Sequence, residues 1–192
     1  MTKHILMGSL FVLCVTACFG QHAGRFRSDS YGGLSIGQMG SYGQVQTVNG
    51  LTRGPWFVGL GAGLDYYRFR NVPLFLSATR DLLANQRSAL FLILDGGVDL
   101  PLYKRPSQAY LDLTSSFRAG PYWRTGLGYR WRFSEAGHRA LLFSATYGES
   151  RLTERQTTNG RCYDYPACTI TSETDTFDYT NRTMQVGVGV EF

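Results

Sequence analysis

Apolar and polar residues alternate with a period of two along most of the chain, which predicts a protein built from β-strands. The C-terminal segment 184–192 shows this most clearly, because one of its faces is apolar and the other is small or polar. The apolar face carries Met184, Val186, Val188, Val190 and Phe192. A helix would not sort residues in this way.

Segment 117–133 alternates too, and its two faces differ sharply in chemistry. Aromatic residues dominate one face, while the other carries Arg118, Arg124, Arg130 and Arg132. This pattern fits lipid outside and a polar lumen inside. Trp123 and Trp131 on the aromatic face are separated by about 20 Å along a tilted barrel strand, close to the ~25 Å between two interfacial girdles.

Six further segments complete the predicted set of strands. They cover residues 33–37, 43–48, 56–69, 74–82, 90–100 and 139–151. A closed barrel with both termini on one side needs an even number of strands, and this set brings the total to eight. The predicted fold is all-β: an eight-stranded antiparallel up-and-down transmembrane β-barrel. Both long connections, 101–116 and 153–180, then fall opposite the termini, as in outer-membrane barrels.

The N-terminus has the pattern of a secretory signal. Lys3 and His4 precede an apolar run, and small residues follow up to Gly20. We expect a signal peptide at 1–20, a short tail at 21–30 and the barrel domain at 31–192. Lipidation at Cys18 is an alternative to cleavage after Gly20. A membrane anchor fits less well, because the run is shorter than the ~20 residues of a spanning helix.

The composition agrees with a lipid-facing β-protein. Charged residues make up 17% of the chain, against about 25% in soluble domains. The net charge is +5, but the basic residues are scattered, so we expect no nucleic-acid partner.

Several segments resemble the small outer-membrane β-barrel domain that is common in Bacteroidota. They are Thr47–Gly50, Val58–Tyr67, Val72–Leu76, Gly126–Arg130 and Val188–Phe192. The resemblance implies an eight-stranded barrel similar to the OmpA and OmpX type, and it implies no catalytic residues. The terminal aromatic Phe192 also resembles the signal that is read by the barrel-assembly machinery.

The inward faces of the predicted strands carry charges of both signs. The expected lumen residues are Asp65, Asp81, Asp95, Asp99, Arg118, Arg124, Arg130, Arg132 and Glu191. Buried charges must be paired and hydrogen-bonded, and an eight-stranded barrel is only wide enough for side chains to fill it. We therefore expect a polar plug, with a narrow ion or solute pathway as the alternative.

Outward aromatics and two cysteines supply the other candidate sites. The expected interfacial aromatics are Trp56, Tyr66, Trp123, Trp131 and Phe192. Cys162 and Cys168 form an even pair in an exported chain, which predicts a disulfide. A metal site would need further Cys or His nearby. The polar loop 153–180 that holds them is a candidate surface for an external ligand.

The functional prediction is a monomeric barrel in the bacterial outer membrane, in contact with its lipids, with a structural or surface-interaction role. Barrel enzymes need an arranged His and Ser, but His22 and His138 are not placed to pair with Ser144. We expect no catalysis, cofactor or metal. The alternatives are a small-solute pore, a lipid-modifying barrel enzyme, or a soluble periplasmic calycin-like binding barrel. The last requires a polar outside and an apolar inside.

Overall fold

The computed structural model describes residues 24–67, 70–102, 113–133, 139–159 and 172–192. These residues form strands throughout, joined by short turns. The strands are β1 (Arg25–Gly37), β2 (Gly40–Arg53), β3 (Trp56–Asp65), β4 (Asn71–Ala84), β5 (Ser88–Pro101), β6 (Leu113–Arg118), β7 (Gly120–Arg132), β8 (Ala140–Asn159) and β9 (Ser172–Glu191). Across this part of the chain, no helix is long and apolar enough to span a bilayer.

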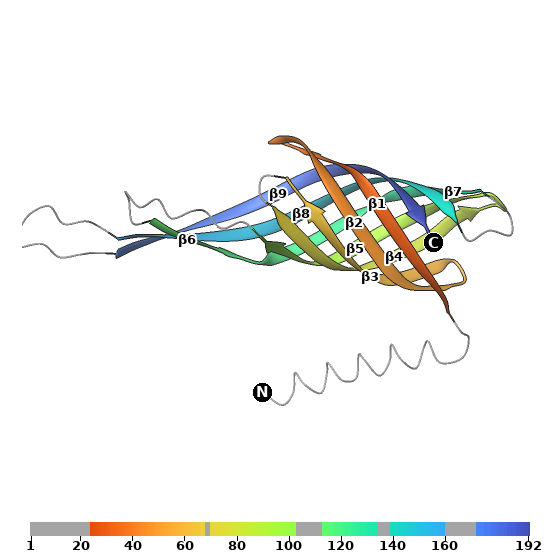
Figure 1. The fold of residues 1–192 in the computed structure, drawn as a ribbon, viewed down its shortest axis with the longest axis horizontal. Helices are drawn as coiled ribbons and strands as arrows, with labels where there is room; N and C mark the ends of the chain where they lie inside the picture. Colours follow the sequence, from red (N-terminus) through yellow and green to blue (C-terminus); the bar gives the residue numbers. More distant parts are fainter. Residues whose placement is uncertain (1–23, 68–69, 103–112, 134–138, 160–171) are drawn as a thin grey trace, which may run out of the picture.

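Eight of the strands close into a barrel (Figure 1). The ring runs β1-β2-β3-β4-β5-β7-β8-β9, and every neighbouring pair is antiparallel. It closes where β9 pairs with β1, and the last residue completes the seam. The Phe192 amide donates to the Ser28 carbonyl at 2.9 Å, and the Ser28 amide donates back at 3.1 Å. The predicted eight-stranded up-and-down barrel is therefore confirmed.

The ninth strand, β6, extends β7 past a β-bulge. Arg118 pairs with Thr153 on β8, whereas Tyr122 pairs with Ser150. Three residues, 119–121, therefore lie opposite two, which reverses the faces of β6 relative to β7. The prediction that Arg118 faces the lumen is wrong for this reason: its side chain is exposed on the outside. Phe117, expected on the lipid face, instead shares the inward face with its cross-strand partner Glu154.

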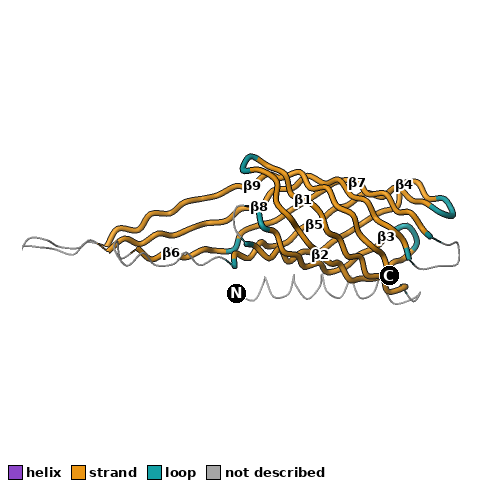
Figure 2. Tube along the Cα trace, turned by 45° about the horizontal axis from the view of Figure 1, so that its top comes forward, coloured by secondary structure: helices purple, strands orange, loops and turns teal. Residues whose placement is uncertain are grey.

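The two ends of the barrel differ in shape. At the terminal end, where β1 begins and β9 ends, the described β2–β3 turn is tight and contains Gly54 at φ 58°. At the opposite, far end, β8 and β9 continue as strands of 20 residues each. Together with β6 they form a three-stranded sheet that projects from the barrel (Figure 2). We call it the projecting sheet, comprising residues 113–118, 153–159 and 172–182.

Two predicted boundaries change as a result. Strand β1 begins at Arg25, so residues 25–30 belong to the barrel and not to an N-terminal tail. The expected loop 153–180 is strand over 153–159 and 172–180, and the expected loop 101–116 is strand from Leu113 onward. Hydrophobic alternation is weak in these segments, because they carry polar residues on both faces.

Apolar side chains face outward and polar ones face inward. Outward residues of the middle of the barrel remain exposed, for example Leu60 at 71%, Leu76 at 54% and Val188 at 52%. Inward residues Asp95, Arg124 and others are almost fully buried, at 6% and 4% exposure for these two. This distribution is the reverse of that in a soluble barrel and is typical of a barrel surrounded by lipid.

Candidate functional site

The terminal end of the lumen contains a network of charged side chains from four strands. The Glu191 carboxylate is shared by two arginines, with Arg27 Nε at 3.1 Å and Arg130 Nε at 2.6 Å. Arg27 also donates to Asp29, from Nε to Oδ1 at 2.8 Å. Arg130 Nη1 lies 3.0 Å from Asp81 Oδ2. The network joins β1, β4, β7 and β9, and thus reaches across the lumen.

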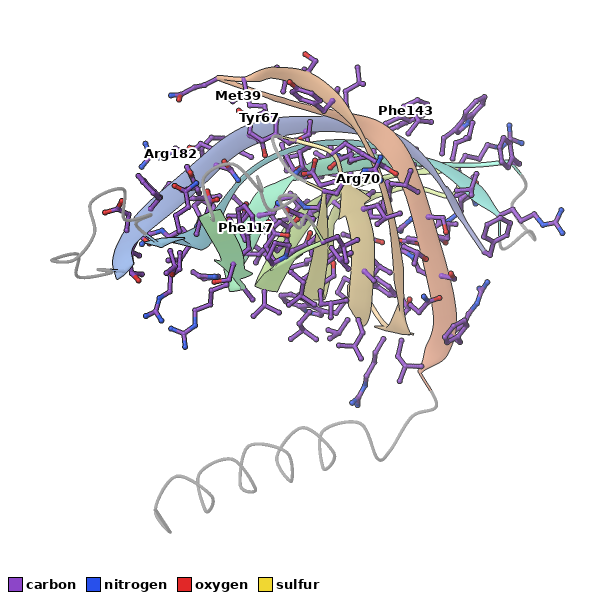
Figure 3. The ribbon with its side chains drawn as sticks, turned by 60° about the vertical axis from the view of Figure 1, so that its left-hand side comes forward. Met39, Tyr67, Arg70, Phe117, Phe143 and Arg182 are labelled. Atoms are coloured by element: carbon purple, nitrogen blue, oxygen red, sulfur yellow. The ribbon has the colours of Figure 1, made fainter. Side chains whose placement is uncertain are left out.

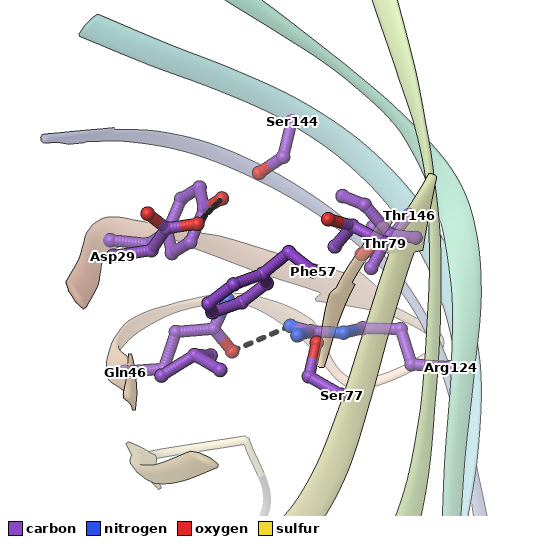
Figure 4. Close-up of a pocket in the computed structure, with 11 residues that line it drawn as sticks. Asp29, Gln46, Phe57, Ser77, Thr79, Arg124, Ser144 and Thr146 are labelled. Carbon is purple, nitrogen blue, oxygen red and sulfur yellow. Dashed lines mark hydrogen bonds between the residues drawn. The ribbon is translucent and has the colours of Figure 1, made fainter. Parts of the chain in front are cut away.

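A second network fills the middle of the lumen around Arg124, whose side chain is 4% exposed. Its Nε donates to Asp95 Oδ2 at 2.7 Å, and its Nη2 forms an ion pair with the same carboxylate. Its Nη1 donates to Gln46 Oε1 at 2.6 Å and to Gln185 Oε1 at 2.9 Å. Figure 4 shows the Gln46–Arg124 bond beside the ring of Phe57. One guanidinium therefore ties together β2, β5, β7 and β9.

Each of these lumenal arginines also lies over an aromatic ring, which adds a cation–π contact to its ion pairs. From guanidinium carbon to ring centroid, the distances are 4.5 Å for Arg27 over Phe57, 5.4 Å for Arg124 over Phe75 and 5.1 Å for Arg130 over Phe91.

Inward glycines make room for the rings. Gly61 lies directly opposite Phe75 across the β3–β4 pair, and Gly128 lies opposite Phe91 across the β5–β7 pair. A Cβ atom on Gly61 would be 2.3 Å from the Phe75 ring, and one on Gly128 would be 2.2 Å from the Phe91 ring. The glycine-rich inward faces are thus a packing requirement of the filled lumen.

The remaining expected lumen residues lie outside these networks. Asp65 and Asp99 line the far end of the lumen, and neither forms an ion pair among the described residues. Arg132 lies at the terminal rim, where its Nη1 donates to the carbonyls of Asn85 and Gln86 at 3.3 and 3.4 Å. The structure therefore brings together Asp81, Arg130 and Glu191 in one network, and Asp95 with Arg124 in the other.

The lumen is closely packed between the charged groups. Two cavities inside it measure about 10 Å³, around Arg124 and Phe57, and about 20 Å³, around Asp65 and Asp99. Each has room for about one water molecule. The first is lined by side chains of the networks and by buried apolar residues such as Val48, Phe57 and Ile93. The second is lined mainly by polar side chains outside the networks, together with Tyr67 and Tyr122.

Sequence reasoning missed Arg27 and Asp29, because the first strand was expected to begin later. The missing signal is the alternation of 26–31, in which Arg27, Asp29 and Tyr31 are buried while Phe26 is exposed. The inward rings Phe57, Phe75 and Phe91 were also missed. They follow from the same alternation, because each occupies a position between two outward apolar residues.

Outward aromatics gather near both ends of the barrel. At the terminal end, Trp56 lies beneath Arg80, whose guanidinium carbon is 5.1 Å from the ring centroid. Trp131 and Phe192 belong to this end as well, at 48% and 58% exposure. The contact between Arg80 and Trp56 also explains how Arg80 is accommodated on an otherwise apolar face.

At the far end, Trp123 packs edge-on against Tyr147 with centroids 6.0 Å apart. Tyr66 at the same end lies 5.7 Å from the guanidinium carbon of Arg70. Two girdles of this kind are what a transmembrane barrel places at its two interfaces with water.

The projecting sheet has a buried carboxylate of its own. Glu154 is 1% exposed, and it accepts hydrogen bonds from Ser115 Oγ at 2.5 Å and from Tyr179 Oη at 2.9 Å. These bonds join β6, β8 and β9, so the sheet is held together by side chains as well as by its ladder. Cys162 and Cys168 lie outside the described residues, and their disulfide remains a prediction.

A groove of about 250 Å³ lies at the base of the projecting sheet. It is bounded by the β1–β2 turn on one side and by β9 on the other. Figure 3 shows Met39 and Tyr67 close together on the turn side, where the Met39 amide donates to Tyr67 Oη at 2.9 Å. Arg151 and Arg182 line the opposite side.

The closed eight-stranded ring, the apolar outside and the paired charges inside define a β-barrel of the transmembrane class. Among solved structures, the chain is similar to Neisserial surface protein A (NspA), with a TM-score of 0.54 and 10% sequence identity. The similarity covers 86% of this chain and 94% of NspA, and it shows a shared fold. No family model and no curated protein sequence matches the chain. The resemblance to the Bacteroidota domain therefore remains a prediction from sequence motifs.

Proposed function

We propose that this protein is an outer-membrane barrel with a closed lumen, and that its role is carried out on the cell surface by the projecting sheet. The observation that carries the proposal is the combination of a filled, ion-paired lumen with a sheet that extends well past the far girdle. A lumen filled by side chains supports no wide channel, so the exposed part of the molecule offers the surface for interaction. The solved neighbour NspA is likewise called a surface protein.

The orientation follows from the two ends. Outer-membrane barrels have short periplasmic turns and longer external loops. The terminal end carries both ends of the barrel chain and the tight β2–β3 turn, and is assigned to the periplasm. The far end carries the projecting sheet, which then stands outside the cell.

The edge of β9 makes the projecting sheet suitable for binding another chain. Strand β1 ends at Gly37, opposite Thr183. Over residues 172–182, β8 is therefore the one partner of β9 in the part of the chain that the structure describes. An open strand edge can take up an extended peptide through main-chain hydrogen bonds. The groove beside Arg151 and Arg182 lies where this edge meets the barrel, and it provides space for a side chain of such a partner.

A shortened hairpin tests the surface role. Residues 156–175 would be replaced by Asn-Gly, which joins the paired residues Arg155 and Thr176 by a two-residue turn. We expect the barrel to fold, because the last β7–β8 pair is Tyr122–Ser150. Cells that display each form would be compared for adherence to a panel of immobilised proteins and glycans. Adherence that the full chain confers should be lost with the shortened form, and retention by that form would refute the proposed site.

Planar-bilayer recordings separate a plug from a pore. The paired charges and small cavities support a closed lumen, for which we expect no conductance steps above those of protein-free bilayers. Conductance steps that occur only when the barrel is present would instead favour the small-solute pathway. We further propose that the barrel is not an enzyme, because the buried arginines of its lumen are engaged in structural ion pairs.

The soluble calycin-like alternative requires the opposite distribution of side chains. Its interior would be apolar and its exterior polar, whereas the described residues show buried arginines and exposed Leu60, Leu76 and Val188. This distribution argues against a soluble binding barrel.

Deletion of Phe192 should impair assembly. Its backbone closes the β1–β9 seam, and its exposed ring ends the outward row of β9. We expect the folded, heat-modifiable form in outer membranes to fall severalfold while export continues, and Phe192→Tyr to behave like the native chain. Equal amounts of folded barrel with and without residue 192 would refute a role as the assembly signal.

A further inference from the structure

The cavity at the far end of the lumen brings together two carboxylates and an amide from three successive strands. Asp65 ends β3, and Asn71, at the start of β4, lies directly opposite it. The Nδ2 atom of Asn71 donates to Oδ2 of Asp99 on β5 at 3.1 Å. All three residues line the same cavity of about 20 Å³, together with Glu149, Ser150 and Asn181 from the opposite wall. Glu149 is already ion-paired with Arg151 and Arg182, so the uncommitted carboxylates are those of Asp65 and Asp99.

These two carboxylates differ from the other acids of the lumen because no arginine of the described residues forms an ion pair with them. Asp29, Asp81, Asp95 and Glu191 each form an ion pair with an arginine. Within the described part of the chain, no ion pair joins Asp65 or Asp99. The hydrogen bonds of Arg124 go to Asp95, Gln46 and Gln185, so Arg124 acts on Asp65 through its charge at longer range and not through a direct contact.

The cavity also contains oxygen atoms that lack a partner. Oδ1 of Asn71 and Oδ1 of Asp99 make no hydrogen bond within the described residues, although the two residues are only 3% and 4% exposed. Buried polar atoms are nearly always satisfied. Both atoms are acceptors, so the group that satisfies them must be a hydrogen-bond donor or a cation. Two neighbouring negative charges favour a cation, because buried charges are either paired or coordinate metals.

We propose that the cavity is a binding site for a hard divalent cation, with Ca²⁺ as the ion to test first. The carboxylates of Asp65 and Asp99 and the Oδ1 atom of Asn71 would be its protein ligands. Such a set of carboxylate and amide oxygens is what Ca²⁺ takes in proteins. No cluster of three or more His, Cys, Asp or Glu side chains is found among the described residues. Two carboxylates therefore place the affinity in the weak range of extracellular sites, about 0.1–1 mM.

The cavity lies at the far end of the lumen. The proposed orientation places this end outside the cell, so the ion would come from there. Bound there, it would join β3, β4 and β5 at the level where the barrel gives way to the loops. The inference needs only the barrel itself and does not depend on whether the projecting sheet binds a partner.

Terbium luminescence tests the site directly. Tyr122 and Tyr67 line the cavity, so excitation of tyrosine should sensitise a bound Tb³⁺. The refolded full-length barrel in a non-ionic detergent would be freed of metal with a chelator and titrated with Tb³⁺, then with Ca²⁺ as competitor. We expect a saturable signal that Ca²⁺ displaces, with Mg²⁺ as a separate competitor.

Asp99→Asn keeps the shape of the ligand and removes its charge, and we expect it to weaken binding by about tenfold or more, since charge count tunes affinity in these sites. Asp178→Asn is the matched control, because Asp178 is an exposed acid on the projecting sheet and should leave the titration unchanged. Thermal unfolding with and without Ca²⁺ supplies a second readout. The proposal is overturned if the native chain and Asp99→Asn bind Tb³⁺ equally. It is also overturned if Ca²⁺ fails to raise the unfolding temperature of the native chain. That failure is the result that a cavity holding only water or a shared proton would give.

Discussion

Arg124→Met should lower the free energy of unfolding by about 3–5 kcal/mol, because it leaves the Asp95 carboxylate buried without its cation. Asp95 is 6% exposed and, among the described residues, forms an ion pair with no arginine other than Arg124. The change also removes the donor that Gln46 and Gln185 share. Unfolding by urea in phospholipid vesicles, followed by tryptophan fluorescence, measures the effect.

Two further variants test whether the unpaired Asp95 carboxylate causes this loss of stability. Arg124→Met combined with Asp95→Leu removes both charges, and replacing a buried ion pair by apolar residues is often neutral. We therefore expect this double variant to recover most of the loss. Arg132→Met at the terminal rim should change stability by less than about 0.5 kcal/mol, as is usual for surface positions. A single Arg124→Met variant as stable as the native chain would show that the lumen is wet enough to solvate Asp95.

Leu60→Arg should destabilise the inserted barrel by about 2–4 kcal/mol, the usual cost of an arginine on the lipid face at the bilayer midplane. Leu60 lies in the middle of β3 and is the most exposed of the outward leucines, at 71%. Unfolding by urea in phospholipid vesicles measures this effect as well.

The matched control is Leu83→Arg, at the terminal end of β4, where exposure is 70%. Near the interface the cost falls to about 0–1 kcal/mol, because the side chain reaches water. Equal effects at the two positions would mean that no depth-dependent lipid environment surrounds the barrel. In a soluble protein, both substitutions would be tolerated.

Much of the barrel could be predicted from the sequence, because a transmembrane strand must alternate. In β9, Met184 to Val190 face lipid at every second position, and the eight-stranded ring follows from counting such segments. The pairing of Asp95 with Arg124 could not be derived, since it depends on the register between β5 and β7. The sequence placed both residues in the lumen without showing that they lie directly opposite each other.

The wrong predictions have a common physical origin. They occur where the alternation of apolar and polar residues shifts by one position, or where both faces of a strand are polar. The bulge at 119–121 adds one residue, and period-two reasoning then assigns Arg118 to the wrong face. In the projecting sheet, threonines and charges occupy both faces, so the ladder of β8 and β9 resembles a polar loop. The start of β1 was missed because Arg27 and Asp29 are charged, although each is buried by its partner.

Spin labels on the outward face of β9 provide the most direct test that this barrel spans a membrane. Single cysteines would be placed at Thr176, Thr180, Val186 and Val188 in a chain whose four native cysteines are replaced by serine. Each variant would be labelled and inserted into phospholipid vesicles. Collision with oxygen reports lipid, and collision with a water-soluble nickel chelate reports solvent. Labels at Val186 and Val188 should favour oxygen strongly, while those at Thr176 and Thr180 should favour nickel, with the change falling near Met184. Equal access of nickel to all four positions would contradict a transmembrane barrel.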